Sequence, residues 1–172
     1  AWATNGGGTA WGVQQTFTTP AVPISISATA LTAFGPACIN STAGPNSFTI
    51  NGAFLTTANV NVGPLAGYTF STTAGGTYTA SLSLVQPGGT YTQQVFVKFN
   101  PTAVQAYTGN IPVAGGGFAT TVNVAASGSG VNSTATVITG TAVNITTQSA
   151  LVAGQVITEG CSAVTSYGVE WS

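Results

Sequence analysis

Two glutamates, Glu159 and Glu170, are the only side chains of this chain that could serve as carboxylic acids or carboxylate bases. A pair of carboxylates can hydrolyse a glycosidic bond, one as the general acid and the other as base or nucleophile. The chain offers this pair no basic partner beyond Lys98, because arginine and histidine are absent. Glu170 also alternates with Val169 and Trp171, which places it on the solvent side of a predicted strand. We therefore predict that the protein is not an enzyme and has no catalytic, cofactor or metal site.

Charge is almost absent from the whole chain. Charged residues make up 2% of the sequence, where an ordinary soluble domain has about 25%. This composition excludes a basic patch for nucleic acid, and a surface without charge repulsion tends to associate. It favours a protein that exists in a stable assembly, or one whose surface is coated with covalent glycan.

All three tryptophans lie in the terminal segments of the chain, at Trp2, Trp11 and Trp171. Indole rings can stack on sugars, and they can also act as the large anchors of a protein interface. We favour packing at an interface over glycan binding. The predicted subunit-interface residues are Trp2, Trp11, Val13, Phe17, Tyr167, Val169 and Trp171.

Glycine triplets and glycosylation sequons are two further motifs. The triplets 6–8 and 115–117 could cradle an anion, but neither precedes a predicted helix, so we interpret both as turns. Three N-x-S/T sequons, at Asn40, Asn132 and Asn144, are candidate glycosylation sites. Such triplets also arise by chance in a chain rich in Ser, Thr and Asn.

The two cysteines, Cys38 and Cys161, are too few for a disulfide scaffold. They could form one bridge within a subunit or between subunits, or remain two buried free thiols, and the sequence leaves these alternatives open. The chain starts at Ala1 inside a strand-like pattern, which indicates either a processed end or a piece of a longer chain.

The remaining composition is typical of an all-β protein. Thr and Val suit strands, the 23 glycines and 8 prolines suit turns, and strong helix formers are nearly absent. No run of about 18 apolar residues is present, so we expect no membrane span. The expected strands of the central region are 24–34, 47–54, 58–62, 68–71, 78–84, 92–99, 109–113 and 119–126.

Alternation within these strands predicts which side chains are buried. In QQVFVKFN, the side chains of Val95, Val97 and Phe99 point to one face and those of Phe96 and Lys98 to the other. Tyr107 precedes a predicted strand, where its hydroxyl can reach back to the backbone as in a tyrosine corner. The predicted core residues are Phe48, Ile50, Val95, Val97, Phe99, Tyr107, Val122 and Val124.

The two ends of the chain each predict an incomplete structure. Residues 1–20 read as a hairpin, with a turn at 5–8 and a longer second strand through Trp11, Val13 and Phe17. An isolated hairpin is marginal in water and must pack on something. Residues 132–172 offer three strands at most, at 134–138, at 142–145 with a continuation to 156, and at 164–171.

Several stretches resemble known extracellular modules. Residues 48–131 resemble the Ig-like repeats of large bacterial surface proteins, over about half of the chain. The matching pieces are SFTINGAFL, YTFSTTAGGTYTASLSLVQPGGT, VFVKFNPTAVQAYTGNI and VNVAASGSGV. TAVNITTQSALVAGQVITEGCSAVTSYGVEWS is similar to the first three strands of a bacterial fibronectin type III-like domain, and AWATNGGGTAWGVQQTFTTP to the last two strands of the same kind of domain.

This resemblance implies an all-β fold in three parts. They are a terminal hairpin (1–20), an Ig-like β-sandwich (21–131), and the first strands of a second, split fibronectin type III-like sandwich (132–172). In a sandwich with an odd number of strands the two chain ends leave at opposite poles, so the ends of one molecule should not meet. They can meet between neighbours, and a head-to-tail contact that does not close gives a filament.

The expected function is therefore a structural subunit of an extracellular bacterial filament or cell-surface fibre, assembled head to tail by strand complementation. Its partners would be further copies of itself and covalent glycans, with no nucleic acid. One alternative is an adhesin or glycan-binding stalk module. Another is a fragment of a long tandem-repeat surface protein.

Overall fold

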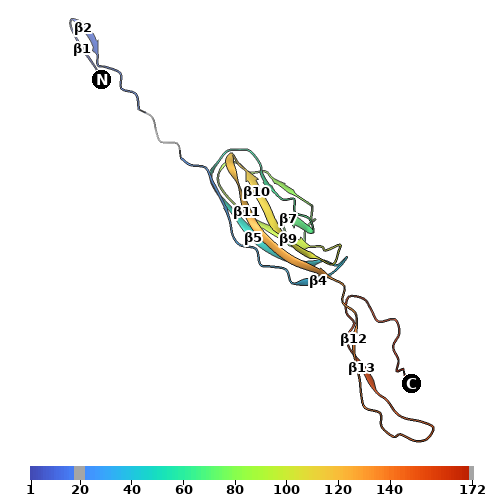
Figure 1. Cartoon of the computed structure of the whole chain (residues 1–172). Coiled ribbons are helices and arrows are strands. Elements are labelled where there is room, and N and C mark those ends of the chain that lie inside the picture. The colour runs from blue at the N-terminus through green and yellow to red at the C-terminus, as the bar shows by residue number, and fades with distance from the viewer. Residues whose placement is uncertain (18–21, 171–172) are drawn as a thin grey trace.

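The computed structural model describes residues 1–17 and 22–170, and these residues form an all-β structure in three parts (Figure 1). The parts are an N-terminal hairpin, a central sandwich that spans residues 22–131, and a C-terminal segment that spans residues 132–170. No helix in the described ranges is long and apolar enough to cross a membrane. Trp171 lies outside the described residues.

The central sandwich consists of two packed sheets. The first has the order β3-β5-β9-β7, and the second has the order β4-β11-β10-β6-β8. Neighbouring strands are antiparallel except for β4 and β11, which run parallel. The strands are β3 (Ser25–Ala28), β4 (Pro36–Cys38), β5 (Ala43–Leu55), β6 (Val60–Val62), β7 (Tyr68–Ser71), β8 (Leu82–Leu84), β9 (Gly89–Phe99), β10 (Ala106–Gly115) and β11 (Phe118–Val131). This architecture confirms the predicted Ig-like sandwich fold.

The predicted alternation of β9 is confirmed, because Val95, Val97 and Phe99 are fully buried between the sheets. Of the eight predicted core residues, seven are buried and Val122 is half-buried against the same cluster. An aromatic cluster closes one end of the core. The Phe99 ring lies 5.7, 5.1 and 5.3 Å, centroid to centroid, from the rings of Phe34, Tyr68 and Tyr107.

Tyr107 forms the predicted tyrosine corner at the start of β10. Its hydroxyl oxygen accepts hydrogen bonds from the backbone N–H groups of Thr102 (3.0 Å) and Ala103 (2.9 Å). Its own backbone carbonyl accepts a hydrogen bond from the hydroxyl of Tyr68 at 2.7 Å. These bonds fix the connection between β9 and β10, and they join the two sheets at this pole of the sandwich.

The expected strand 24–34 is wrong in its second half, since β3 ends at Ala28. After β3 the chain crosses to the other sheet, where the Phe34 N–H donates to the carbonyl of Ser127 at 2.8 Å. β4 then pairs with β11. β4 is not among the expected strands, because a strand of three residues shows no period in the sequence.

The glycine triplet 115–117 is a turn, as predicted. All three residues have positive φ, at 111°, 60° and 81°, which only glycine adopts without strain. The turn joins β10 to β11, and the carbonyl of Gly116 accepts a hydrogen bond from the Thr56 N–H at 2.8 Å. It thereby ties the second sheet to the end of β5 at the N-terminal pole, the pole at which β3 begins.

The two chain ends form small two-stranded sheets. β1 (Trp2–Asn5) pairs with β2 (Gly8–Trp11), and β12 (Thr136–Thr139) pairs with β13 (Gly154–Thr158). β2 ends at Trp11 rather than continuing to Phe17, so the predicted longer strand is wrong. The expected strand 164–171 is also wrong for the described residues 164–170, which are not in strand conformation. Both segments lack a neighbouring strand within the described chain, and a strand needs one to satisfy its backbone.

Candidate functional site

The N-terminal hairpin presents two tryptophans as a pair on one face. Trp2 is directly opposite Trp11 in the β1–β2 register. Their ring centroids are 6.1 Å apart, and the rings are 65% and 77% exposed. The Thr4 and Thr9 hydroxyls are hydrogen-bonded to each other on the same face, while Ala3 and Ala10 lie on the other. The hairpin thus has one aromatic face, and the structure leaves that face in solvent.

Val13 and Phe17 follow the hairpin and are also unburied, at 85% and 87% exposure. The turn itself is well defined, since the Asn5 side-chain oxygen accepts a hydrogen bond from the Gly7 N–H at 2.9 Å. A two-stranded hairpin is marginally stable on its own in water. The hairpin therefore leaves its large apolar side chains exposed and buries none of them within the described chain.

The C-terminal segment contains a groove of about 650 Å³ between the β12–β13 hairpin and residues 164–169. Of the predicted interface residues, Tyr167 and Val169 line this groove, with Tyr167 89% exposed and Val169 40% exposed. The groove residues are Ala135, Val137, Ile138, Thr139, Gly154, Gln155, Val156, Val164, Ser166, Tyr167, Gly168 and Val169. The structure brings Tyr167 and Val169 together in one groove. At the other chain end it pairs Trp2 with Trp11, while Val13 and Phe17 follow the hairpin along the chain.

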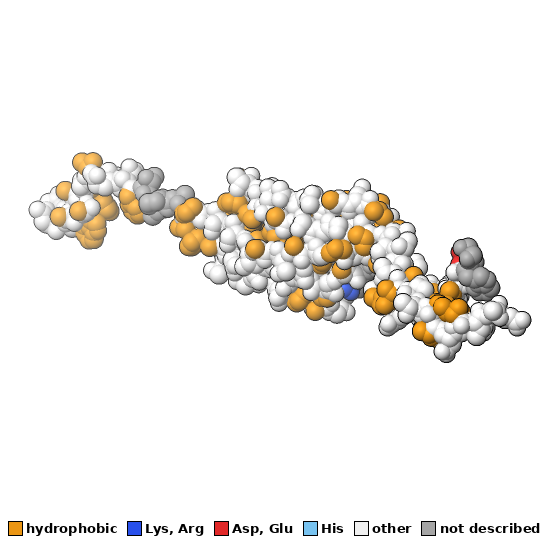
Figure 2. Space-filling view, turned by 60° about the horizontal axis from the view of Figure 1, so that its bottom comes forward, with side chains coloured by type: hydrophobic (Ala, Val, Ile, Leu, Met, Phe, Trp, Pro, Cys, Tyr) orange, Lys and Arg blue, Asp and Glu red, His pale blue; other side chains and the backbone are white. Residues whose placement is uncertain are grey.

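The C-terminal segment exposes many apolar side chains, and residues 164–169 form one side of its groove. Figure 2 shows hydrophobic side chains on the surface of both terminal parts. In the C-terminal segment the large exposed hydrophobic residues also include Val137, Ile138, Val143, Ile145, Leu151 and Ile157. Within the described chain, no backbone–backbone hydrogen bond joins residues 164–170 to another residue. The segment thus exposes an apolar surface beside a stretch of backbone that has no backbone partner in the described chain.

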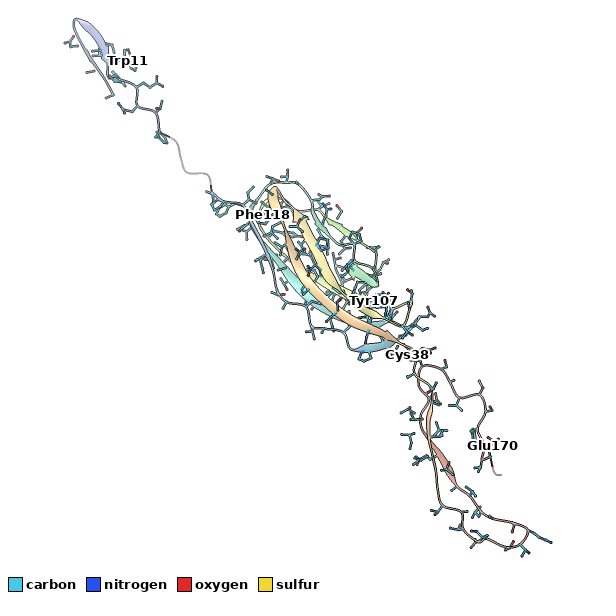
Figure 3. The ribbon with its side chains drawn as sticks, viewed as in Figure 1. Trp11, Cys38, Tyr107, Phe118 and Glu170 are labelled. Carbon is cyan, nitrogen blue, oxygen red and sulfur yellow. A yellow bond between two sulfur atoms is a disulfide. The ribbon has the colours of Figure 1, made fainter. Side chains whose placement is uncertain are left out.

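Cys38 and Cys161 form a disulfide, with 5.4 Å between their Cα atoms. Cys38 ends β4 beside Val131, the last residue of β11. The Cys161 N–H donates a hydrogen bond to the carbonyl of Ser133 at 2.9 Å. The bridge therefore fastens the base of the C-terminal segment to the pole where the chain leaves the sandwich (Figure 3). The sequence left the state of these cysteines open, because spacing alone does not place them together.

The remaining candidate residues are dispersed on the surface. Asn40, Asn132 and Asn144 are all exposed, which leaves each sequon accessible. Glu159 and Glu170 are exposed as well, and neither lines the groove. Within residues 1–17 and 22–170, no three acidic, histidine or cysteine side chains gather as a metal site.

Three apolar side chains that the sequence does not predict to be exposed lie near the N-terminal pole of the sandwich. Phe54 is 58% exposed there, and its φ of 56° is unusual for a residue with a side chain. Val22 and Val85 are also largely exposed. A shift in register between Gly52 and Leu55 turns Phe54 outward, and a regular period of two does not reveal such a bulge.

Comparison with known proteins identifies no family for this chain. No family model matches it, and no curated protein matches it. Among solved structures, the ASH / PapD-like domain of human CEP192 (PapD-like domain 7) is similar to it. The two are 15% identical with a TM-score of 0.37, and the match covers 71% of this chain and 97% of that domain.

Proposed function

We propose that this protein is a structural subunit of an extracellular filament that assembles head to tail by strand complementation. The observation that carries the proposal is the contrast between its parts. The central sandwich buries most of its large apolar side chains, whereas both flanking modules leave most of theirs exposed. β1–β2 and β12–β13 are each two-stranded, and each is incomplete as a sandwich. Together they would supply strands to one shared module.

The positions of the two chain ends favour a contact between neighbouring molecules over a contact within one molecule. Phe118 and Cys38 mark opposite poles of the sandwich (Figure 3). β11 connects the poles with 14 residues, a length of about 45 Å. Residues 12–24, between β2 and β3, reach about 45 Å when fully extended. The hairpin would have to stretch along the whole sandwich to touch the base of its own C-terminal segment, while a neighbour placed head to tail requires no stretching.

The chemistry of the chain ends suits such a junction. Residues 1–17 carry no charged side chain, and the C-terminal segment carries only Glu159 and Glu170. Contact would therefore rest on apolar burial and on backbone hydrogen bonds between strand edges. A heterologous contact of this kind gives a filament when successive subunits do not close into a ring. The disulfide supports an extracellular location, because such bridges persist in oxidising compartments.

Electron microscopy of the purified chain, with an intact-mass measurement on the same sample, tests this function. We expect fibres with a regular repeat that dissolve in denaturant into chains of 16.9 kDa. A sample that stays monomeric at high concentration would contradict the proposal. A chain mass far above this value would instead indicate a covalent tandem-repeat surface protein.

A glycan-binding stalk module is the second candidate, and the exposed Trp2–Trp11 pair favours it. Rings presented in solvent are suited to stacking on the faces of sugars. Titration of tryptophan fluorescence with a panel of oligosaccharides distinguishes the two functions. A saturable response in the monomeric protein supports glycan binding, and no response supports the filament subunit.

A further inference from the structure

We propose that the groove between β12–β13 and residues 164–169 is the socket for the tryptophan face of the N-terminal hairpin of a second copy of this chain. This inference rests on the proposed function and assigns the contact that would join two subunits. It names both the receiving surface and the inserted one.

The groove has the size and lining of a site for large side chains. Its volume of about 650 Å³ lies within the usual range of ligand pockets. Val137 and Val156 line one wall, and Val164 and Val169 line the other. The second wall, residues 164–170, has no backbone–backbone hydrogen bond within the described chain, so it offers donors and acceptors to an incoming strand. An apolar surface beside backbone groups that have no partner in the described chain is what a complementing hairpin requires.

Only one of the two faces of the hairpin carries large apolar side chains that suit the groove. Trp2 and Trp11 lie opposite each other with centroids 6.1 Å apart, so the two rings can enter as a single block. Ala3 and Ala10 lie on the opposite face and provide little apolar area. The register thereby gives the hairpin a defined orientation, with its aromatic face toward the groove.

Charge also supports a second copy as the occupant. The groove lining contains no charged residue, and neither do residues 1–17. A charged peptide would lose its hydration in this groove without gaining a partner. The hairpin has no charged side chain to desolvate, and the reach of residues 12–24 favours insertion from a neighbour.

Cross-linking between two variants tests the socket directly. The described chain holds no free thiol, so each new cysteine is a unique reactive site. One variant carries Thr9→Cys, on the tryptophan face, and the other carries Ser166→Cys, in the groove lining. The two are mixed in full-length form, treated with a short bismaleimide, and separated on a denaturing gel. We expect a covalent heterodimer.

Three control variants make the result specific. Thr120→Cys places a thiol on the exposed surface of β11, away from the groove, and should give no dimer with Thr9→Cys. Adding Trp2→Ala and Trp11→Ala to the Thr9→Cys chain should lower the dimer yield at least about tenfold, because both anchors are lost. Ala10→Ser changes the opposite face of the hairpin and should leave the yield unchanged.

The outcomes test the proposed socket and the proposed filament separately. Fibres without cross-linking between positions 9 and 166, or with equal cross-linking to position 120, would overturn the socket and leave the filament standing. Cross-linking without fibres would support the socket and overturn the filament. Cross-linking within one chain that carries both cysteines, at a yield independent of concentration, would show that the hairpin closes on its own molecule and overturn the second copy as the occupant.

Discussion

Gln86 shows how single buried residues hold the central sandwich in one arrangement. This side chain is 4% exposed and lies in the loop between β8 and β9. Its Nε2 donates to the backbone carbonyls of Thr56 and Ala58, and its Oε1 accepts from the Gly88 N–H at 2.6 Å. One side chain thus satisfies three backbone groups of two neighbouring loops at the N-terminal pole.

Replacing Gln86 with leucine should lower the free energy of unfolding by about 2–4 kcal/mol, because buried backbone groups lose their partners. Urea unfolding followed by fluorescence measures the loss. Gln94→Leu is the control, since Gln94 is exposed and its side chain bonds only to the Ser47 hydroxyl within the described chain. Equal stability of the two variants would mean that water replaces the Gln86 bonds.

Val97 tests the packing of the core at the level of a single side chain. It is fully buried in β9, so Val97→Ala deletes buried methyl groups and should cost about 1–3 kcal/mol. The measurement is again urea unfolding of the purified chain. A loss below about 0.3 kcal/mol would contradict the assignment of this face to the core.

The glutamates provide a test of the absence of acid–base chemistry. Glu159 and Glu170 are exposed and lie outside the groove. Replacing both with glutamine should leave assembly, and any binding, unchanged between pH 4 and 9, as followed by sedimentation. An activity that depends sharply on pH and disappears in the double variant would overturn the prediction that the protein is not an enzyme.

At the scale of elements, the Cys38–Cys161 bridge connects the sandwich to the C-terminal segment across 123 positions of sequence. A cross-link that closes a long loop reduces the freedom of the unfolded chain, so it stabilises the folded one. The bridge also holds the base of the segment beside β4 and β11. It therefore serves both stability and the placement of the groove.

Replacing both cysteines with serine should lower the free energy of unfolding by about 2–5 kcal/mol. The original chain treated with a reductant should show the same loss, which controls for the serines themselves. Unchanged stability in both samples would indicate that the cysteines are not bridged in the folded protein.

The elements that the sequence predicts correctly are those with a local signal. Alternation identifies the inward face of β9, and the position of Tyr107 identifies its hydrogen bonds. β4 has no such signal, because it is a strand only through its pairing with β11. The prediction of a strand at residues 164–170 is wrong for the opposite reason. Their pattern is that of a strand, but the described chain supplies no partner for it.

The same distinction applies to the candidate site. The sequence identifies which apolar residues lie at the chain ends. Its low content of charged residues also shows that few charges lie beside them. It does not reveal the groove, since the groove depends on how residues 164–169 fold back beside β12 and β13. The exposed position of Phe54 is equally hidden, because it follows from a local shift in strand register.

At the scale of the whole molecule, the central sandwich separates two parts that each contain one two-stranded sheet. The N-terminal hairpin presents an aromatic face, and the C-terminal segment presents an apolar groove. The chain joins them through opposite poles of the sandwich (Figure 3). In a head-to-tail array each junction would complete one module, so every subunit would donate at one end and receive at the other.

Deletion of residues 1–19 tests this account most directly, with electron microscopy of the truncated chain beside the full one. The central sandwich starts after the deleted residues and keeps its core, so its unfolding transition should remain cooperative. We expect the full chain to form ordered fibres and the truncated chain to form none, because no hairpin remains to enter the next subunit. Fibres of the truncated chain with the original repeat would contradict the account, and would place the subunit contact on the central sandwich.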